Sequence, residues 1–324
     1  MNTKIKWGII GLGKIAHKFA SDLLLSENAV LHGVASRSLE KAKTFSTQYK
    51  SITYYGSYEG LVKDHEIDVV YIATPHTFHF ENTMLCFQNN KSVLCEKPLG
   101  ISTQEVQTMI KEATSRNLFF MEAICTRFMP ATEKLIELFN QNIIGDVISI
   151  HADFGFKAPI DLKGRLYNKK LGGGSLLDIG IYPIYLSLLI LGVPTNIKAM
   201  ARMTSTNVDS YCAMLFDYKN SAKAMLESTI EVNTPTEAII YGSNGTIKVH
   251  NRFPLAEKLS IYQDDKLKER FELNYTGNGY VHEIEEVNNC LLMGKLQSNK
   301  LPHQLSLDLI TTIDRVKKQI GLSY

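Results

Sequence analysis

KWGIIGLGKIA, residues 6–16, is a short apolar run that breaks at two glycines and resumes with helix-forming residues. This order predicts a strand, a tight turn and a helix. Gly11 permits the turn, Gly13 lets backbone N–H groups approach a pyrophosphate, and the small Ala16 lets the helix start close to the strand. Glycines at this spacing also occur in plain turns. The position directly after a first strand favours a dinucleotide site, with contacts from Gly11, Leu12, Gly13, Lys14, Ile15 and Ala16.

The composition is that of an ordinary globular protein. A chain of 324 residues is long for one hydrophobic core and predicts two domains. The formal net charge of +2 argues against a nucleic-acid-binding surface. The most apolar segment, residues 176–192, contains Asp178 and Pro183 and is too short and interrupted for a membrane span. It is interpreted as a buried helix, and no signal-peptide core precedes the first strand, so we expect a cytoplasmic protein.

Cysteine and histidine spacing gives no sign of a disulfide framework or a metal centre. The five cysteines lack C-x-x-C pairing, which predicts reduced thiols. His76 and His79 form an H-x-x-H pattern, but no further ligand cluster completes a site. We therefore predict that the protein binds no metal.

The end of the predicted second strand, residues 29–36, indicates the cofactor. A fold that binds NAD usually carries Asp or Glu about 20 residues beyond the glycines, to hold the ribose 2′-hydroxyl. This chain has Ser36, Arg37 and Ser38 instead. A guanidinium and two hydroxyls suit a 2′-phosphate, so NADP is predicted and NAD is the alternative. Arg37 as a plain surface residue is the structural alternative.

Further buried runs, near residues 67–74, 92–95 and 119–123, alternate with helical patterns and predict a doubly wound parallel sheet of six strands. Ser102 and Glu105 form a capping pattern that opens the helix up to Arg116. Ligands of such folds bind at the carboxyl ends of the strands. Further cofactor contacts are therefore predicted from Thr74, Pro75, His76, His79, Glu96 and Lys97, with capping of the next helix as the alternative for His79.

The regular alternation of strand and helix patterns ends near Thr126. A helix over residues 131–140 and a strand over 147–156 are followed by successive strand patterns between 197 and 262, which predict a mostly antiparallel sheet. We therefore expect a Rossmann domain over 1–125 and a second α/β domain over 126–324. The helices of the second domain can cover one face of its sheet, and the strands give no clearly polar outer face. This predicts a homo-oligomer, in its simplest form a dimer.

Lys97 is the first candidate for proton transfer. It follows a buried strand, and Pro98 restricts its backbone to extended conformations. Beside an oxidised, positively charged nicotinamide its amine has reason to lose a proton, and it could then take the hydroxyl proton while hydride leaves the carbon. The alternative is that Lys97 only pairs with Glu96 or another carboxylate.

Asp178 and Tyr182 form the second candidate cluster, within Gly172–Tyr182. They are four residues apart, which would place both on one face of an α-helix. The carboxylate could orient substrate hydroxyls or Lys97, and the phenol could donate a proton or anchor substrate. A carboxylate placed only for the helix dipole and a packed tyrosine are the structural alternatives.

The G-x-G-x-x-A pattern, Cys95-Glu96-Lys97-Pro98 and Gly172–Tyr182 together resemble the Gfo/Idh/MocA oxidoreductase family, over essentially the whole chain. Residues 120–123, Arg127-Phe128 and Gly279-Tyr280 look most like its branch of dimeric dihydrodiol dehydrogenases and NADP-dependent D-xylose dehydrogenases. The combination is specific, whereas each motif alone is not.

The resemblance implies an active site in the cleft between the two domains and an open sheet that forms oligomer contacts. The family's E-K-P lysine falls on Lys97, with a frequent cis bond before Pro98. Its D-x-G-x-x-H/Y motif falls on Asp178 and Tyr182, and tyrosine here argues against an inositol substrate. Cys125 replaces a tryptophan common in the branch, and the predicted substrate pocket comprises Cys125, Arg127, Phe154 and Tyr182.

The predicted function is an NADP-dependent oxidoreductase that transfers a hydride between the nicotinamide and a secondary alcohol or carbonyl of a sugar or cyclic diol. Redox-assisted cleavage of a glycoside by a retained cofactor is an alternative from another enzyme class. A non-enzymatic NADP sensor is disfavoured, because it has no need for Lys97, Asp178 and Tyr182.

Overall fold

The chain divides into two units in the computed structural model, which describes residues 4–324. The first unit comprises Met1–Phe128 and Thr276–Leu307. The second comprises Met129–Tyr275 and Asp308–Tyr324. The division differs from a single boundary at 125, because a C-terminal segment returns to the first unit.

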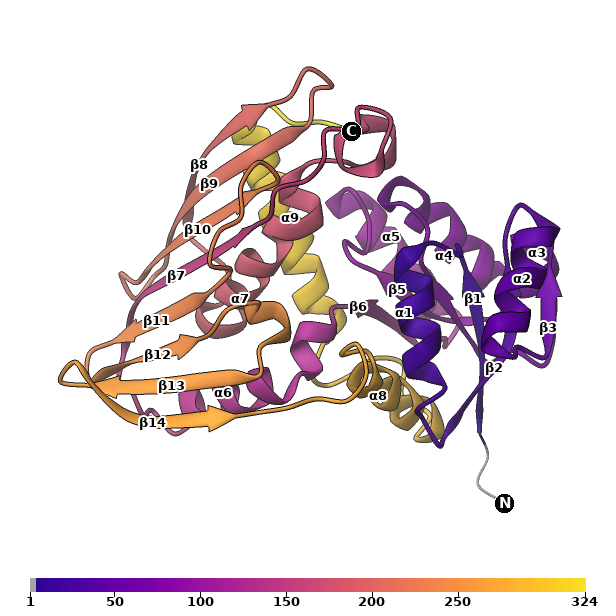
Figure 1. Cartoon of the computed structure of the whole chain (residues 1–324), viewed down its shortest axis with the longest axis horizontal. Coiled ribbons are helices and arrows are strands. Elements are labelled where there is room, and N and C mark those ends of the chain that lie inside the picture. Colours follow the sequence, from indigo (N-terminus) through magenta and orange to yellow (C-terminus); the bar gives the residue numbers. More distant parts are fainter. Residues whose placement is uncertain (1–3) are drawn as a thin grey trace. The chain divides into compact units, whose positions relative to one another are not determined.

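A six-stranded, wholly parallel sheet forms the centre of the first unit (Figure 1). Its order is β3-β2-β1-β4-β5-β6, which confirms the predicted doubly wound fold. The strands are β1 (Ile5–Ile10), β2 (Ala29–Ala35), β3 (Thr53–Tyr55), β4 (Val69–Ile72), β5 (Ser92–Glu96) and β6 (Phe120–Ala123). The order reverses between β1 and β4, where such sheets bind ligands at the carboxyl ends of the strands.

Serine residues cap the N-termini of several helices in this unit. Ser38, Ser57 and Ser102 each accept a hydrogen bond from the backbone N–H three residues later, as N-cap residues do. The predicted cap of α5 is confirmed, although the Glu105 carboxylate accepts from the amide of Ile101. The helices are α1 (Lys14–Leu23), α2 (Leu39–Tyr49), α3 (Tyr58–Val62), α4 (His79–Gln88), α5 (Thr103–Ser115) and α8 (Val281–Leu292).

The returning segment supplies hydrogen-bond partners for two buried polar groups of the first unit. The indole N–H of Trp7 donates to Oδ1 of Asn288 at 3.0 Å. The carboxylate of Asp22 accepts from the amides of Asn278 and Tyr280 at 2.8–2.9 Å. A buried indole N–H or carboxylate without a partner is costly, so these contacts hold α8 on the first unit.

The second unit is built on an eight-stranded sheet in the order β14-β13-β12-β11-β7-β10-β9-β8. Its strands are β7 (Val147–Gly155), β8 (Asn196–Met203), β9 (Asp209–Asp217), β10 (Lys223–Thr229), β11 (Ala238–Gly242), β12 (Gly245–Val249), β13 (Lys258–Gln263) and β14 (Lys266–Glu272). Only β7 and β10 pair in parallel, which confirms the mostly antiparallel prediction. Helices α6 (Pro130–Asn140), α7 (Ile181–Leu191) and the C-terminal part of α9 (His303–Ile320) lie along one face of this sheet (Figure 1).

The sequence patterns missed β14. Its residues, KLKERFE, are mostly charged and exposed, so the strand lacks the apolar alternation of its neighbours. It is an edge strand, where charged side chains oppose pairing with other chains. Asp264 and Asp265 form the turn before it with φ of +50° and +56°, as a two-residue hairpin of type I′ requires.

The long apolar helix predicted at residues 176–192 is divided. Leu176–Gly180 forms a π-helical turn, and α7 follows it directly. The helical stretch Lys169–Leu191 is long and apolar enough to cross a membrane, contrary to the length argument. However, 83% of its most apolar window is buried inside the fold, as in a core helix of a globular protein.

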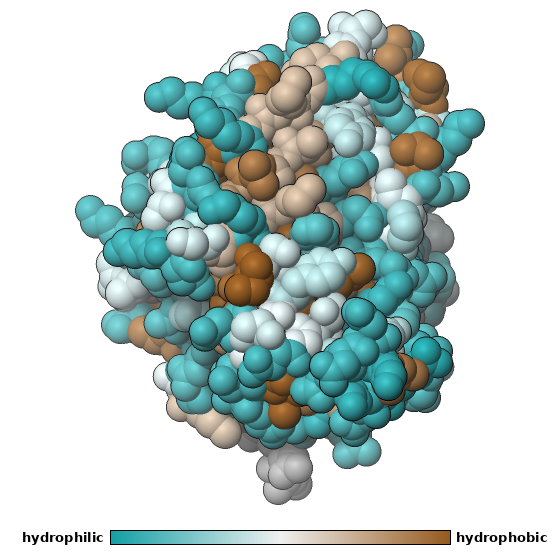
Figure 2. All heavy atoms as spheres, turned by 90° about the vertical axis from the view of Figure 1, so that its left-hand side faces the viewer, coloured by the Kyte–Doolittle hydropathy of each residue, from teal (hydrophilic) through white to brown (hydrophobic). Residues whose placement is uncertain are grey.

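The other face of the eight-stranded sheet is open and carries exposed apolar side chains. Met200, Leu215 and Met225 are 80%, 46% and 53% exposed. Figure 2 shows apolar side chains gathered on the side of the molecule formed by this sheet. Side chains alternate between the two faces along each strand, and Phe216 and Leu226 are buried on the opposite face. The prediction of an incompletely polar outer face is therefore confirmed.

Candidate active site

Gly11 forms the turn at the carboxyl end of β1. Its φ is +86°, and a Cβ there would lie 2.8 Å from the backbone of Ala73 and Thr74. Any larger residue would push β1 away from the end of β4. The conformational role predicted for Gly11 is therefore confirmed.

The N-terminus of α1 is open to an anion. Gly13 is its exposed N-cap, and a Cβ built there would meet no atom within 4 Å. No acidic residue occurs in the first turn of α1, so nothing neutralises its positive end. Ala16 is fully buried and Leu12 nearly so, which leaves the backbone and exposed Lys14 for contacts with a ligand. These features fit the phosphates of a dinucleotide.

The segment after β2 presents a cation and no carboxylate. Arg37 is exposed, and its charge opposes the rise that burial causes in the pKa of Tyr58. The hydroxyl of Ser36 accepts from the amide of Ser38, and the hydroxyl of Ser38 accepts from the amide of Lys41. The two serines therefore shape the turn, and Arg37 supplies the charge that suits a phosphate.

The end of β4 brings Thr74, Pro75 and His76 to the same edge of the sheet, with Thr74 and His76 largely buried. His79 follows at the start of α4 and is completely buried. Its Nε2 lies 2.9 Å from the carbonyl oxygen of Thr74, and its Nδ1 lies 2.7 Å from that of Pro98. Both ring nitrogens thus face protein backbone, and the predicted contact of His79 with the cofactor stays a prediction.

Lys97 follows β5 at this edge and is half-buried. The Lys97–Pro98 bond is cis, as the family resemblance implied. The carboxylate of Glu96 accepts a hydrogen bond from the hydroxyl of Tyr71. Glu96 therefore has a structural partner on β4, and the backbone of Lys97 lies at the carboxyl edge of the sheet.

Two further buried carboxyl groups feel the charges of Glu96 or Lys97 at the end of β5, and no sequence signal identified them. Burial raises the pKa of Glu122 to about 7, while the charge of Lys97 acts to lower it. Burial, and then the charge of Glu96, raise the pKa of Glu283 well above its usual range. Glu283 is fully buried on α8, and among residues 4–324 neither carboxyl oxygen has a hydrogen-bond partner. A neutral Glu283 avoids the cost of a second charge beside Glu96.

Cys125 and Arg127 occupy a short helical turn after β6. Cys125 is buried, and burial raises the pKa of its thiol, so the sulfur is unreactive. Nε of Arg127 donates to the carbonyl oxygen of Lys300 at 2.9 Å. Arg127 therefore anchors the returning segment within the first unit, and its predicted substrate contact is untested.

Asp178 of the second unit is held by a residue that sequence reasoning missed. The guanidinium of Arg165 donates two hydrogen bonds to its carboxylate, at 2.9 and 3.0 Å. Such a bidentate pair fixes both the charge and the orientation of the carboxylate. Arg165 begins a short 3₁₀ turn, Arg165–Tyr167, that carries no sequence motif, so only the tertiary structure reveals this pairing.

Tyr182 begins the α-helical part of the same segment and is half-exposed. Its ring packs against Phe154, with ring centroids 5.6 Å apart. Asp178 lies on the π-helical turn, so the one-face argument for an α-helix does not apply to the pair. Phe154 and Tyr182, two members of the predicted substrate pocket, are therefore neighbours, and their contact with a substrate stays a prediction.

A buried carboxylate stabilises the start of the π-helical turn. Asp209 accepts from the hydroxyl of Ser175 and the amide of Leu176, both at 2.7 Å. Burial raises the pKa of Asp209 to about 6. Asp209 thereby supports the segment that carries Asp178.

Two family models match consecutive parts of the chain. Residues 5–124 match the oxidoreductase family with an NAD-binding Rossmann fold, Gfo/Idh/MocA. Residues 132–248 match the Gfo/Idh/MocA C-terminal domain. No group of three or more His, Cys, Asp or Glu side chains suited to a metal occurs within residues 4–324.

Several relatives match the chain over nearly its full length. It is 37% identical to the trans-1,2-dihydrobenzene-1,2-diol dehydrogenase of Danio rerio, over 99% of this chain and 98% of the relative. The human enzyme of that name is 34% identical, with the same coverage. A 3-ketoreductase from Actinomadura kijaniata, solved with NADP and TDP-benzene, has the same fold, with a TM-score of 0.89, 24% identity and 98% of each chain covered.

Proposed function

Because the chain belongs to the Gfo/Idh/MocA family of NAD(P)-binding oxidoreductases, we propose that it oxidises a secondary alcohol of a sugar or cyclic diol with NADP. The observation that carries the proposal is the joint placement of three groups in the first unit. The open N-terminus of α1, exposed Arg37 and half-buried Lys97 all follow the carboxyl ends of its strands. This is the edge at which such sheets bind nucleotides.

The phosphates of NADP would lie at the backbone of Gly11–Lys14, and Arg37 would hold the 2′-phosphate. When bound, the nicotinamide supplies the acceptor for the hydride that leaves the alcohol carbon. The amine of Lys97 takes the hydroxyl proton, and it returns this proton when the carbonyl is reduced. The phenol of Tyr182 is the second candidate for this proton, and Asp178, oriented by Arg165, would bind substrate hydroxyls.

A panel of free sugars, cyclic diols and glycosides tests the function through absorbance at the nicotinamide band. A net change in absorbance with sugars or diols supports the dehydrogenase. Product release from a glycoside without a net change in absorbance would overturn the proposed dehydrogenase activity in favour of redox-assisted hydrolysis. NADP binding without turnover of any substrate in the panel would favour a sensor.

We expect Cys125 to favour sugars over trans-dihydrodiols of benzene. A thiol in place of the indole common in the branch removes a flat aromatic wall that buries on the order of 150–250 Å². Cys125→Trp should therefore move the kcat/KM ratio toward the aromatic diol. The thermal unfolding midpoint of the variant shows whether the larger indole is accommodated at this buried position. An unchanged ratio in a folded variant would contradict this assignment.

We also propose a homodimer formed through the open face of the eight-stranded sheet. A hollow of about 810 Å³ on that face is lined largely by apolar side chains, including Met200, Leu215 and Met225 (Figure 2). An exposed apolar patch of this kind is typical of an interface, and a second copy presents the same patch. Light scattering should return twice the chain mass of 36.4 kDa.

Met225→Glu should raise the dissociation constant of the dimer at least about tenfold, because it places two like charges in the contact. Met293→Glu is the matched control, since Met293 is also exposed but lies outside the sheet. A wild-type mass that stays monomeric at every concentration would contradict the dimer.

A further inference from the structure

The contacts of His79 are not explained by cofactor binding. Both of its ring nitrogens lie within hydrogen-bond distance of carbonyl oxygens, those of Thr74 and Pro98. A carbonyl oxygen only accepts, and a neutral imidazole carries a single N–H. A neutral ring therefore donates to one of the two oxygens, and we assign the shorter contact, from Nδ1 to the oxygen of Pro98, as that hydrogen bond. His79 thus lies between the ends of β4 and β5, within hydrogen-bond distance of a carbonyl oxygen at each end.

The residue held by His79 is the one next to Lys97. Pro98 directly follows Lys97, and its carbonyl oxygen accepts from Nδ1 of His79 at 2.7 Å. The next residue is held as well, because the amide of Leu99 donates to Oε1 of Glu122 at 2.8 Å. His79 and Glu122 are both buried and belong to α4 and β6, which flank the loop. The backbone after Lys97 is therefore fixed at two successive residues.

We propose that His79 is a positioning residue for Lys97, holding the Pro98 carbonyl oxygen and thereby the place from which the lysine amine reaches the substrate. The inference rests on the proposed role of Lys97 in proton transfer. Catalytic proton transfer depends on placement to within about 1 Å, so a loosened loop lowers the rate even when the amine is present. Glu122 still holds the amide of Leu99 when His79 is replaced, so the expected fall in kcat is limited.

A double-mutant cycle tests whether His79 acts through Lys97. His79→Phe keeps an aromatic ring of similar shape and removes both ring nitrogens. In the wild-type background we expect kcat to fall about tenfold, with the NADPH dissociation constant changed less than about twofold. In the Lys97→Met background the same change should lower kcat less than about twofold. An equal loss in both backgrounds would overturn the proposal.

Hydrogen exchange of the protein without cofactor gives a readout independent of activity. The segment 97–100 should exchange faster in His79→Phe than in wild type, because one of its two anchors is gone. Unchanged exchange there would also overturn the proposal.

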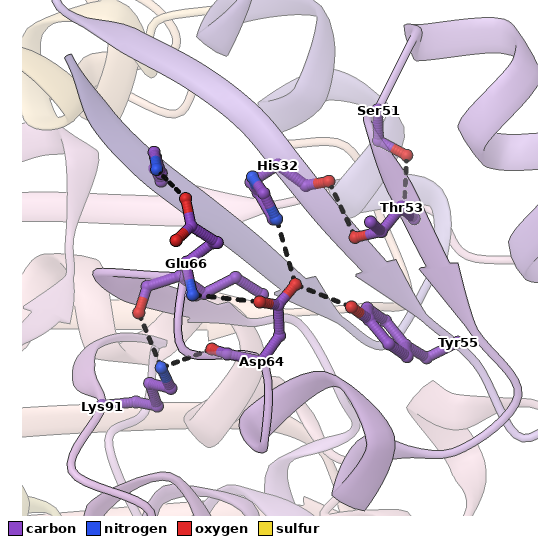
Figure 3. Close-up of polar contacts among 9 residues, drawn as sticks. His32, Ser51, Thr53, Tyr55, Asp64, Glu66 and Lys91 are labelled. Atoms are coloured by element: carbon purple, nitrogen blue, oxygen red, sulfur yellow. Dashed lines mark hydrogen bonds and ion pairs between the residues drawn. The ribbon is translucent and has the colours of Figure 1, made fainter.

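His32→Phe is the matched control. His32 is a buried histidine of the same unit, and its Nε2 contacts Oδ2 of Asp64 at 3.0 Å. Figure 3 shows this contact within a polar cluster in which Asp64 also accepts from Tyr55 and Glu66, and the backbone of Asp64 accepts from Lys91. Loss of His32 should lower thermal stability while leaving kcat and the exchange of segment 97–100 unchanged. A fall in kcat matching that of His79→Phe would show a general stability effect and overturn the proposal.

The two proposals fail in different ways. If Lys97→Met retains the wild-type kcat, the role of Lys97 in the proposed function fails, and the inference about His79 falls with it. If Lys97→Met is strongly impaired and His79→Phe is not, the proposed function stands and only the positioning role is rejected.

Discussion

Lys97→Met is expected to fold, to bind NADPH and to turn over at least about 100-fold more slowly than wild type, the lower end for loss of a general acid or base. The side chain follows β5 at the carboxyl edge of the sheet, where its amine can exchange a proton with a substrate hydroxyl. Methionine keeps the length and the apolar stem of lysine and removes only the group that carries the proton. Stopped-flow measurement of hydride transfer and fluorescence titration with NADPH separate the chemical step from binding.

Tyr182→Phe tests the alternative assignment of proton transfer to the phenol. It removes the phenolic hydroxyl and keeps the ring that packs against Phe154. Under the proposed assignment it should lower kcat less than Lys97→Met does. If Tyr182→Phe is the more damaging change and Lys97→Met remains active, proton transfer belongs to the phenol.

Arg37→Ala should weaken NADPH binding roughly 10- to 100-fold and leave NADH binding almost unchanged. The lost contact is a hydrogen bond to a charged phosphate, worth about 1.5–3 kcal/mol. Arg37 is exposed after β2, while the hydroxyls of Ser36 and Ser38 are engaged with backbone amides, so the guanidinium carries most of the expected preference. Titration of both cofactors by nicotinamide fluorescence measures the effect.

Lys43→Ala controls for the general loss of one positive charge, since Lys43 is an exposed cation on α2. It should change the affinity for NADPH less than about twofold, which is the scale of a screened surface charge. Equal losses of NADPH and NADH affinity in Arg37→Ala would remove the reason for proposing NADP.

The Rossmann sheet was predictable because its signals are local. A buried parallel strand consists of a continuous run of apolar residues, as in β5. The helix that follows Ser102 is indicated by its N-cap residue. Strand β14 escaped prediction because an exposed edge strand has no apolar face to alternate. The division of the apolar segment into a π-helical turn and α7 also escaped prediction, and the start of that turn is hydrogen-bonded to Asp209, a residue distant in sequence.

The site was predictable only where a motif marks it. Gly11, Arg37, Lys97 and the segment containing Asp178 follow from spacing and family resemblance, whereas Arg165 has no motif and was found through its contact with Asp178. His79 was recognised in sequence, but its contacts with the backbone were not. Its burial and its two carbonyl contacts are properties of the assembled sheet edge.

By itself the sequence determined the order of strands and helices in the first unit, the glycine turn and the position of Lys97 after β5, because local backbone preferences and apolar periodicity act over a few neighbouring residues. Only the tertiary structure decided which charges are buried together. Glu283 on α8 lies more than 180 residues from Glu96 in sequence, yet it responds to the charge of Glu96 in the folded chain. Desolvation and Coulomb interactions depend on distance in space, and folding creates those distances.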